Sequence, residues 1–268
     1  MVDKIELGIP FFDERMGGVY RGRQVLCVGR RQSGKSLLAY RFAAQGIRGD
    51  ERVLLLSDMS AKDVLIVAES FGLGFSEAVR REQLMVLEYA GLLGTGGGTA
   101  GNLMLPPDAF MELQDIIEAQ SISRVVFDTV LPWVAIEPVS RLQEHVYSFM
   151  HALDRLGVTA LMTLPKPVSA SAFTLKKYLE DIAPVSLSLD CSDSGDRVLR
   201  VAKYLGESSG FAGGFNFEIV SGIGFRLKGA GSESPKKDTP EPPSSPLGPL
   251  GGSDQPRRAV RFSDVINT

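Results

Sequence analysis

Short apolar runs alternate with longer segments of helical periodicity through much of the chain. The apolar runs occupy residues 25–28, 53–56, 84–87, 125–127 and 158–163. Such runs, bounded by glycine or polar turns, are typical of strands buried on both faces. Between them, residues 36–46, 63–71, 110–120 and 142–156 repeat apolar positions at helical spacing. This alternation predicts an α/β fold, a mostly parallel central sheet with helices on both faces.

The pattern changes after Pro184. Short segments of strand character, separated by polar or glycine turns, occupy residues 185–189, 197–203, 215–220 and 224–227. Close spacing of this kind is typical of antiparallel strands. We therefore expect an antiparallel C-terminal extension to complete the sheet, and one domain to cover residues 1–228.

The composition changes again at Gly229. Residues 229–268 contain seven of the fifteen prolines and few apolar residues. A segment of this composition buries too little apolar surface to offset its ordering entropy, so we expect a disordered tail. Within it, residues 257–266 alternate basic and apolar side chains. These residues are either an unstructured end or a tethered peptide that adds to a sheet edge or groove of a protein partner.

Composition and charge narrow the class of protein. Apolar residues make up 44% of the chain, enough for a sizeable core, and the net charge is −3. This balance leaves DNA binding possible but not favoured. The two cysteines cannot form a metal-binding cluster alone, and a reducing cytoplasm is the expected compartment. No apolar stretch approaches the roughly 18 residues of a spanning helix, and we expect no membrane contact.

The first apolar run leads into a phosphate-binding motif. Gly29 to Ser36 matches GxxxxGK[ST] at every fixed position, between a predicted strand and a predicted helix. Main-chain amides of such a loop surround phosphates, and the helix presents its positive end to them. We expect Lys35 to reach the β and γ phosphates of ATP and Ser36 to bind Mg²⁺. The residues predicted to hold the nucleotide are Gly29, Arg30, Arg31, Gln32, Ser33, Gly34, Lys35, Ser36 and Leu37.

A second candidate follows the fourth apolar run. Asp128 comes directly after three apolar residues, so its carboxylate is expected at the carboxyl edge of the sheet. A carboxylate there suits a direct or water-mediated contact with Mg²⁺, together with Ser36. The alternative is an ordinary aspartate in a turn or helix cap.

These motifs together resemble the KaiC branch of the RecA-type ATPases, over nearly all of residues 4–228. Residues 4–14 are similar to the family's "TGIPGLDE" entry, and Gly17-Gly18 with Arg21-Gly22 match its "GG…RG" lead-in to the first strand. The resemblance implies a RecA-like ATPase core. It also implies a homo-oligomer, a ring or filament with ATP between neighbouring copies.

The chain departs from this family after the second strand. Where the family has two adjacent glutamates, this sequence has Asp58 and Met59. The resemblance assigns Asp58 the role of the base that orients the attacking water. An aspartate is one methylene shorter, which puts the water in a less favourable position. The alternative is that Asp58 only caps the following helix.

A second departure lies in a late strand. The family's "K-x-R-G" motif reaches the γ-phosphate of the adjacent copy; here Lys203 matches the lysine and Leu205 replaces the arginine. Loss of an arginine finger can cost on the order of 10³-fold in rate. We therefore expect ATP to bind and to be hydrolysed slowly, with Lys35, Asp58 and Lys203 as the catalytic candidates. The alternative for Lys203 is a solvated lysine at a strand end.

Three functions fit these observations: a nucleotide-dependent assembly switch or regulator, a recombinase-like DNA-repair accessory protein, and a scaffold that binds nucleotide without turnover. Trp133 follows the Asp128 strand and either stacks on a base or anchors a buried turn. Ser169, Ser171 and Thr174 are expected in a polar loop, and their phosphorylation is neither favoured nor excluded.

Overall fold

The computed structural model describes residues 2–89, 109–134, 139–207 and 214–229. The predicted tail, with its candidate peptide at 257–266, lies outside these ranges except for Gly229. Expectations about the tail therefore remain predictions.

The described strands form a nine-stranded sheet and a separate two-stranded antiparallel sheet. Six neighbouring strands of the large sheet run parallel, and three antiparallel strands follow at one side. This arrangement confirms the predicted parallel sheet and its antiparallel extension. In spatial order the strands are β5 (Leu84–Glu88), β4 (Val53–Ser57), β6 (Arg124–Asp128), β7 (Thr159–Pro165), β3 (Gln24–Gly29), β8 (Val185–Cys191), β9 (Arg197–Tyr204), β10 (Phe215–Val220) and β11 (Gly224–Leu227).

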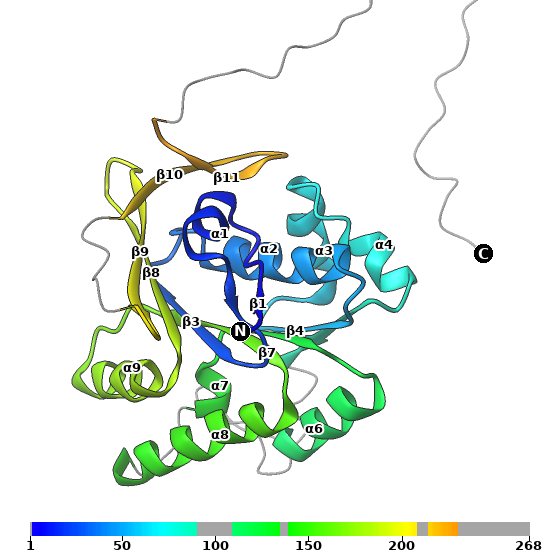
Figure 1. Ribbon diagram of the computed structural model, residues 1–268, viewed down its shortest axis with the longest axis vertical. Coiled ribbons are helices and arrows are strands. Elements are labelled where there is room, and N and C mark those ends of the chain that lie inside the picture. Colours follow the sequence, from blue (N-terminus) through cyan, green and yellow to red (C-terminus); the bar gives the residue numbers. More distant parts are fainter. Residues whose placement is uncertain (1, 90–108, 135–138, 208–213, 230–268) are drawn as a thin grey trace, which may run out of the picture. The chain divides into compact units, whose positions relative to one another are not determined.

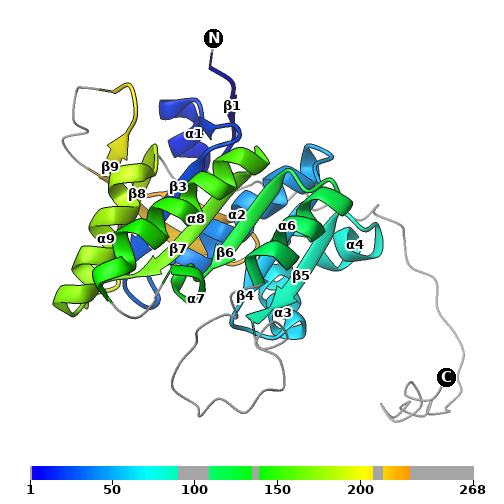
Figure 2. The ribbon, with the colours of Figure 1, turned by 90° about the horizontal axis from the view of Figure 1, so that it is seen from below.

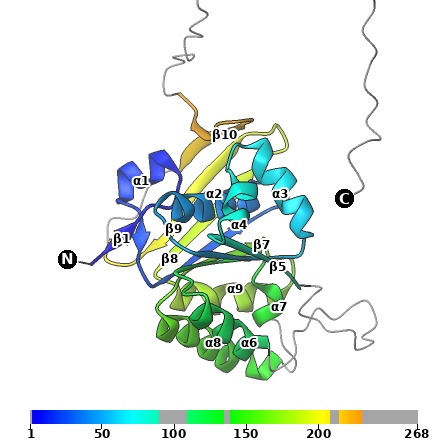
Figure 3. The ribbon, with the colours of Figure 1, turned by 90° about the vertical axis from the view of Figure 1, so that its right-hand side faces the viewer.

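Helices cover both faces of the parallel strands (Figures 1 and 3). One face carries α1 (Pro10–Met16), α2 (Lys35–Arg48), α3 (Ala61–Ser70) and α4 (Phe75–Arg80). The other carries α6 (Ala109–Ala119), α7 (Leu131–Val134), α8 (Leu142–Leu156) and α9 (Ala170–Ile182). Figure 2 looks onto this second face, where α8 lies between α6 and α9. A 3₁₀ turn (Val139–Arg141) precedes α8, and β1 (Lys4–Ile5) pairs with β2 (Val19–Tyr20).

Successive residues of the central strands enter two separate cores. In β3, Val25 and Cys27 pack on the α2 side, whereas Leu26 and Val28 pack on the α8 side. Side chains of a strand point alternately to opposite faces, so a continuous apolar run supplies both cores. Among the described helices, none is long and apolar enough to cross a bilayer.

The expected polar loop around Ser169 was wrong. Ser169 caps a helix, α9, and its Oγ accepts a hydrogen bond from the Ala172 amide at 3.3 Å. Only Leu175 and Leu179 of α9 are buried, so the apolar stripe is too short to stand out among polar residues. The stop predicted at Gly46 was also wrong, because α2 continues to Arg48.

Gly46 is needed inside α2 because a buried arginine lies against it. A Cβ on Gly46 would lie 2.6 Å from Cδ of Arg124, which is only 3% exposed. The Arg124 guanidinium donates from Nε to Glu51 at 2.5 Å and from Nη1 to the carbonyls of Glu6 and Phe42 at 3.0 and 3.2 Å. One side chain thus joins β6, α2 and the N-terminal segment.

We expect Gly46→Ala to destabilise the protein by about 1–3 kcal/mol, the usual cost of overpacking a filled core. The matched control is Gly49→Ala at the end of the same helix, where φ is −83° and the nearest contact of an added Cβ is 3.4 Å. Urea unfolding of both variants measures the difference. Equal unfolding midpoints for the two variants would contradict the claim that Arg124 leaves no room for a side chain at residue 46.

Candidate functional site

The parallel register brings the ends of four strands to one edge of the sheet. Gly29 at the end of β3 pairs with Pro165 of β7, and Phe127 of β6 pairs with Met162 of the same strand. Ser57 of β4 pairs with Asp128. The loop after Gly29, the Asp128 carboxylate and the turn after Ser57 therefore share this carboxyl edge, where open α/β sheets bind ligands.

The loop between β3 and α2 needs glycine at both of its ends. A Cβ on Gly29 would lie 2.4 Å from the Leu189 carbonyl oxygen. Gly34 has φ of 102°, and a Cβ there would lie 2.9 Å from Cδ1 of Ile219 on β10. The antiparallel extension therefore packs directly against the loop. Within the loop, the Arg30 carbonyl accepts hydrogen bonds from Ser33 Oγ at 2.9 Å and Lys35 Nζ at 2.8 Å.

Asp128 lies beneath the start of α2. Its side chain is 6% exposed, and Oδ1 accepts a hydrogen bond from Thr163 Oγ1 at 2.7 Å. Burial raises the pKa of Asp128; hydrogen bonds from Thr163 and Ser36 and the charge of Lys35 oppose the rise. Burial also lowers the pKa of Lys35, against the attraction of Asp128. The structure thus brings Lys35, Ser36 and Asp128 together.

This donor set fits a magnesium ion shared with phosphate. Hydroxyl and carboxylate oxygens are the ligands that Mg²⁺ prefers. Within the described ranges, no group of three His, Cys, Asp or Glu side chains is placed to hold a metal. Ser36 and Asp128 would hold the ion through a few protein contacts, and phosphate oxygens and water would supply the others.

Asp58 lies beside Asp128 on the turn after β4. Its side chain is exposed, and its amide donates to the Asp128 carbonyl at 3.3 Å. The residue that caps α3 is Ser60, whose Oγ accepts from the Asp63 amide at 3.1 Å. Met59 is half-buried, with Sδ 3.9 Å from the Tyr40 hydroxyl. The turn therefore presents one carboxylate at the site and a thioether beside it.

Lys203 lies away from the phosphate loop of its own chain. It pairs with Ser186 near the amino end of β8, whereas the loop follows the carboxyl end of β3. Its Nζ donates to the carbonyls of Glu180 and Asp181 at 2.8 and 2.9 Å, in the last turn of α9. Leu205 lies nearby and is 54% exposed. The structure therefore does not bring Lys203 to the phosphate loop of its own chain.

Sequence reasoning missed Thr163 and Tyr40. Thr163 is buried within an apolar strand, bonded to Asp128. Burial raises the pKa of Tyr40, and Asp128 adds to the rise, so the phenol stays neutral close to that carboxylate. Neither residue stands out in the sequence, because threonine is common in strands and Tyr40 lies among the buried positions of its helix.

Trp133 is a buried anchor rather than a surface for base stacking. Its side chain is 5% exposed, and its ring packs edge-on against Phe127 and Phe110 with centroids 5.5 and 6.5 Å apart. The ring is therefore enclosed by aromatic neighbours on the α8 side of the sheet.

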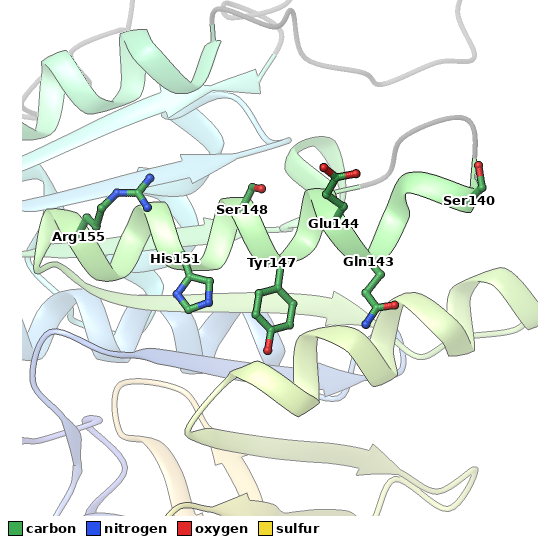
Figure 4. Close-up of a pocket in the computed structure, with 7 residues that line it drawn as sticks. All are labelled: Ser140, Gln143, Glu144, Tyr147, Ser148, His151 and Arg155. Carbon is green, nitrogen blue, oxygen red and sulfur yellow. The ribbon is translucent and has the colours of Figure 1, made fainter.

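A pocket lies along α8, remote in sequence from the phosphate loop (Figure 4). It is lined by Ser140, Gln143, Glu144, Tyr147, Ser148, His151 and Arg155. None of these residues comes from the strand ends that carry the loop, Asp58 and Asp128. We therefore assign the candidate site to the carboxyl edge of the sheet.

Comparison with known proteins finds a family model and relatives that match most of the chain. A family model for KaiC ATPases matches residues 5–223. The circadian clock oscillator protein KaiC of Thermostichus vulcanus is 26% identical over 239 residues, 85% of this chain. That of a Nostoc species is 24% identical over 228 residues, 82% of this chain. The chain spans 45% of the first relative's length and 43% of the second's.

The fold has a solved counterpart. The crystal structure of a KaiC-like protein from Pyrococcus horikoshii OT3 superposes with a TM-score of 0.67 at 22% identity. The match covers 85% of this chain and 99% of that one. This likeness confirms the RecA-like architecture.

We expect Asp128→Asn to raise the melting temperature of the nucleotide-free protein at pH 8 and to weaken Mg²⁺-dependent ATP binding. Because burial raises the folded-state pKa of Asp128, its ionised form opposes folding, and this cost grows as pH rises through that pKa. The loss of ATP affinity should reach at least the ~10-fold typical of residues around a bound metal.

Thermal melts at pH 5 and pH 8, with and without Mg-ATP, test both effects. Asp115→Asn is the control, because Asp115 is exposed on α6. An Asp128→Asn protein less stable than the native chain at pH 8 without ligand would show that the carboxylate is not a destabilising charge.

Proposed function

The chain belongs to the KaiC family of ATPases, and we propose that it binds Mg-ATP at residues 29–37 and acts as a nucleotide-dependent assembly switch or regulator with slow hydrolysis. The observation that carries the proposal is the adjacency of Lys35, Ser36 and Asp128 at the carboxyl edge of the sheet. A cytoplasmic location is part of the same proposal.

The first role of the loop residues is to bind the phosphates of ATP. Lys35 exchanges its bond to the Arg30 carbonyl for phosphate oxygens, and the loop amides turn toward the same phosphates. Ser36 and Asp128 would hold Mg²⁺, which when bound would neutralise phosphate charge. Thr163 keeps the Asp128 carboxylate oriented through its hydrogen bond.

The geometry around Asp58 supports slow turnover. Its backbone is fixed by the bond to the Asp128 carbonyl, and its carboxylate is exposed beside the site. Asp58 orients the attacking water, yet Met59 supplies no second carboxylate to hold Asp58 or the water in place. Misplacement of a catalytic group by about 1 Å can cost roughly 10²-fold in rate.

The position of Lys203 supports assembly into a ring or filament. This lysine lies near the amino ends of the parallel strands and the loop near their carboxyl ends. A neighbouring copy that presents its Lys203 edge to the loop of the first would place a lysine near the γ-phosphate. The exposed Leu205 would enter the same contact without a charge.

A scaffold that binds nucleotide without turnover is the second candidate. Met59 and Leu205 favour it, since each occupies a position where the family resemblance implies a charged group. Recombinase-like DNA binding receives no support from Trp133, which is buried.

Light scattering with phosphate release read on the same sample tests the switch. We expect the particle mass to rise with Mg-ATP and phosphate release to be slow. Leu205→Arg should raise the rate of the assembled protein by at least about tenfold, toward the 10³-fold contribution of an arginine finger. Leu205→Gln controls for size and polarity. A native chain that turns ATP over rapidly, or keeps one mass with and without ATP, would refute the switch.

Residues 257–266 are proposed as the segment that binds a protein partner. We expect deletion of residues 230–268 to leave ATP affinity unchanged and to abolish partner retention. Because the proposed peptide acts through its order of basic and apolar residues, a full-length chain with residues 257–266 scrambled should also lose the partner. Affinity capture followed by mass spectrometry compares the three chains; retention of the same partner by the truncated chain would rule the segment out.

A further inference from the structure

Two arginines of the phosphate loop have no bonded partner among the described residues. The side chains of Arg30 and Arg31 are exposed, and no described residue forms an ion pair or hydrogen bond with either guanidinium. Seven other arginines in the described ranges pair with carboxylates. These are Arg21, Arg23, Arg80, Arg81, Arg124, Arg200 and Arg226.

The backbone that carries these two arginines is held at both sides. The Gly29 carbonyl accepts a hydrogen bond from the Lys166 amide at 2.9 Å. The Gln32 carbonyl accepts one from Arg197 Nε at 3.4 Å, and Gln32 itself has a φ of 61°. Arg30 and Arg31 therefore extend from a fixed loop at the edge that carries Asp128, rather than from a free surface segment.

The other cations near this edge are already engaged. Lys166 Nζ lies 3.1 Å from Asp190, and Arg200 lies 2.9 Å from the second oxygen of the same carboxylate. Lys203 lies toward the opposite edge, bound to carbonyls of α9. Arg197 and Lys35 have no carboxylate partner but donate to backbone carbonyls, those of Gln32 and Gly195 and that of Arg30. Among the described cations beside the loop, Arg30 and Arg31 have neither an ion pair nor a hydrogen bond to the guanidinium.

Hydrolysis of a phosphoanhydride needs cations at the γ-phosphate. Negative charge spreads over the oxygens of the transferring group, and fixed positive groups stabilise that charge most where water is excluded. An arginine can supply this stabilisation from the same chain as well as from a neighbour. Among the described residues, Arg30 and Arg31 combine a positive charge, a place on the phosphate loop itself and a guanidinium without a bonded partner.

We propose that the Arg30–Arg31 pair supplies, within each chain, the cation that stabilises the γ-phosphoryl group during hydrolysis. This inference rests on the proposed function. A water oxygen forms a bond to the γ-phosphorus as the bond to the β,γ-bridging oxygen breaks. ADP leaves with that electron pair, and the water proton passes through Asp58 to solvent as inorganic phosphate forms. The guanidinium groups donate hydrogen bonds to γ oxygens and transfer no proton.

The test compares the full-length chain with Arg30→Gln, Arg31→Gln and the double variant. We expect the double variant to lose at least about tenfold in kcat, a minimum set below the roughly 10³-fold that an arginine finger can contribute, with little change in KM for ATP. It should still bind ADP but fail to form the complex of ADP with fluoroaluminate, which mimics the transferring phosphoryl group. Arg48→Gln, exposed at the far end of α2, is the matched control.

Measurement of kcat at several protein concentrations distinguishes a stabilising cation on the same chain from one on a neighbouring copy. We expect kcat per chain to stay constant on dilution below the concentration at which copies assemble. Unchanged kcat in the double variant, a loss confined to KM, or a native rate that vanishes on dilution would each overturn the inference. ATP binding without any hydrolysis by the native chain overturns the inference and leaves nucleotide binding intact. No ATP binding at all overturns the proposed function itself.

Discussion

The arrangement of the site depends on a carboxylate buried at the end of a parallel sheet without a full counter-charge. Asp128 receives a hydrogen bond from Thr163 and lies beside Ser36 and Lys35, yet burial still raises its pKa. A divalent cation brought by a phosphate ligand would relieve this cost, because it favours the charged form of the carboxylate. The same feature that opposes folding of the unliganded chain therefore favours binding of a metal–phosphate ligand.

The scaffold keeps that carboxylate in place from both faces of the sheet. Strand pairing sets Asp128 level with Ser57, and the aromatic cluster around Trp133 packs under Phe127. On the opposite face, buried Arg124 ties the start of the same strand to α2 through its contacts with the Phe42 carbonyl and Glu51. A strand fixed at both ends can hold a charged group in an unfavourable environment, because surrounding contacts compensate for the local cost.

Much of the fold could be predicted from the sequence because buried parallel strands are uninterrupted apolar runs and the phosphate loop has a fixed spacing. Features that depend on a few contacts between distant segments could not be predicted. Gly46 reads as a helix stop, yet it lies inside α2 because Arg124 fills the space of its missing side chain. The helix after Ser169 buries only two residues, so its stripe is too short to identify. Thr163 resembles an ordinary strand residue until the pairing sets it beside Asp128.

The topology also limits what one chain can contribute to catalysis. Parallel strands direct every loop that follows them to one edge, whereas antiparallel β9 carries Lys203 back toward the other. A cation placed as Lys203 is can act only between copies, so turnover that relied on it would depend on assembly. A cation on the loop itself acts wherever the loop binds phosphate. Leu205 is uncharged, whereas Arg30 is exposed on the loop. In the proposed mechanism the cation at the γ-phosphate therefore comes from the same chain rather than from a neighbouring copy. In such a chain, assembly and hydrolysis can be controlled separately.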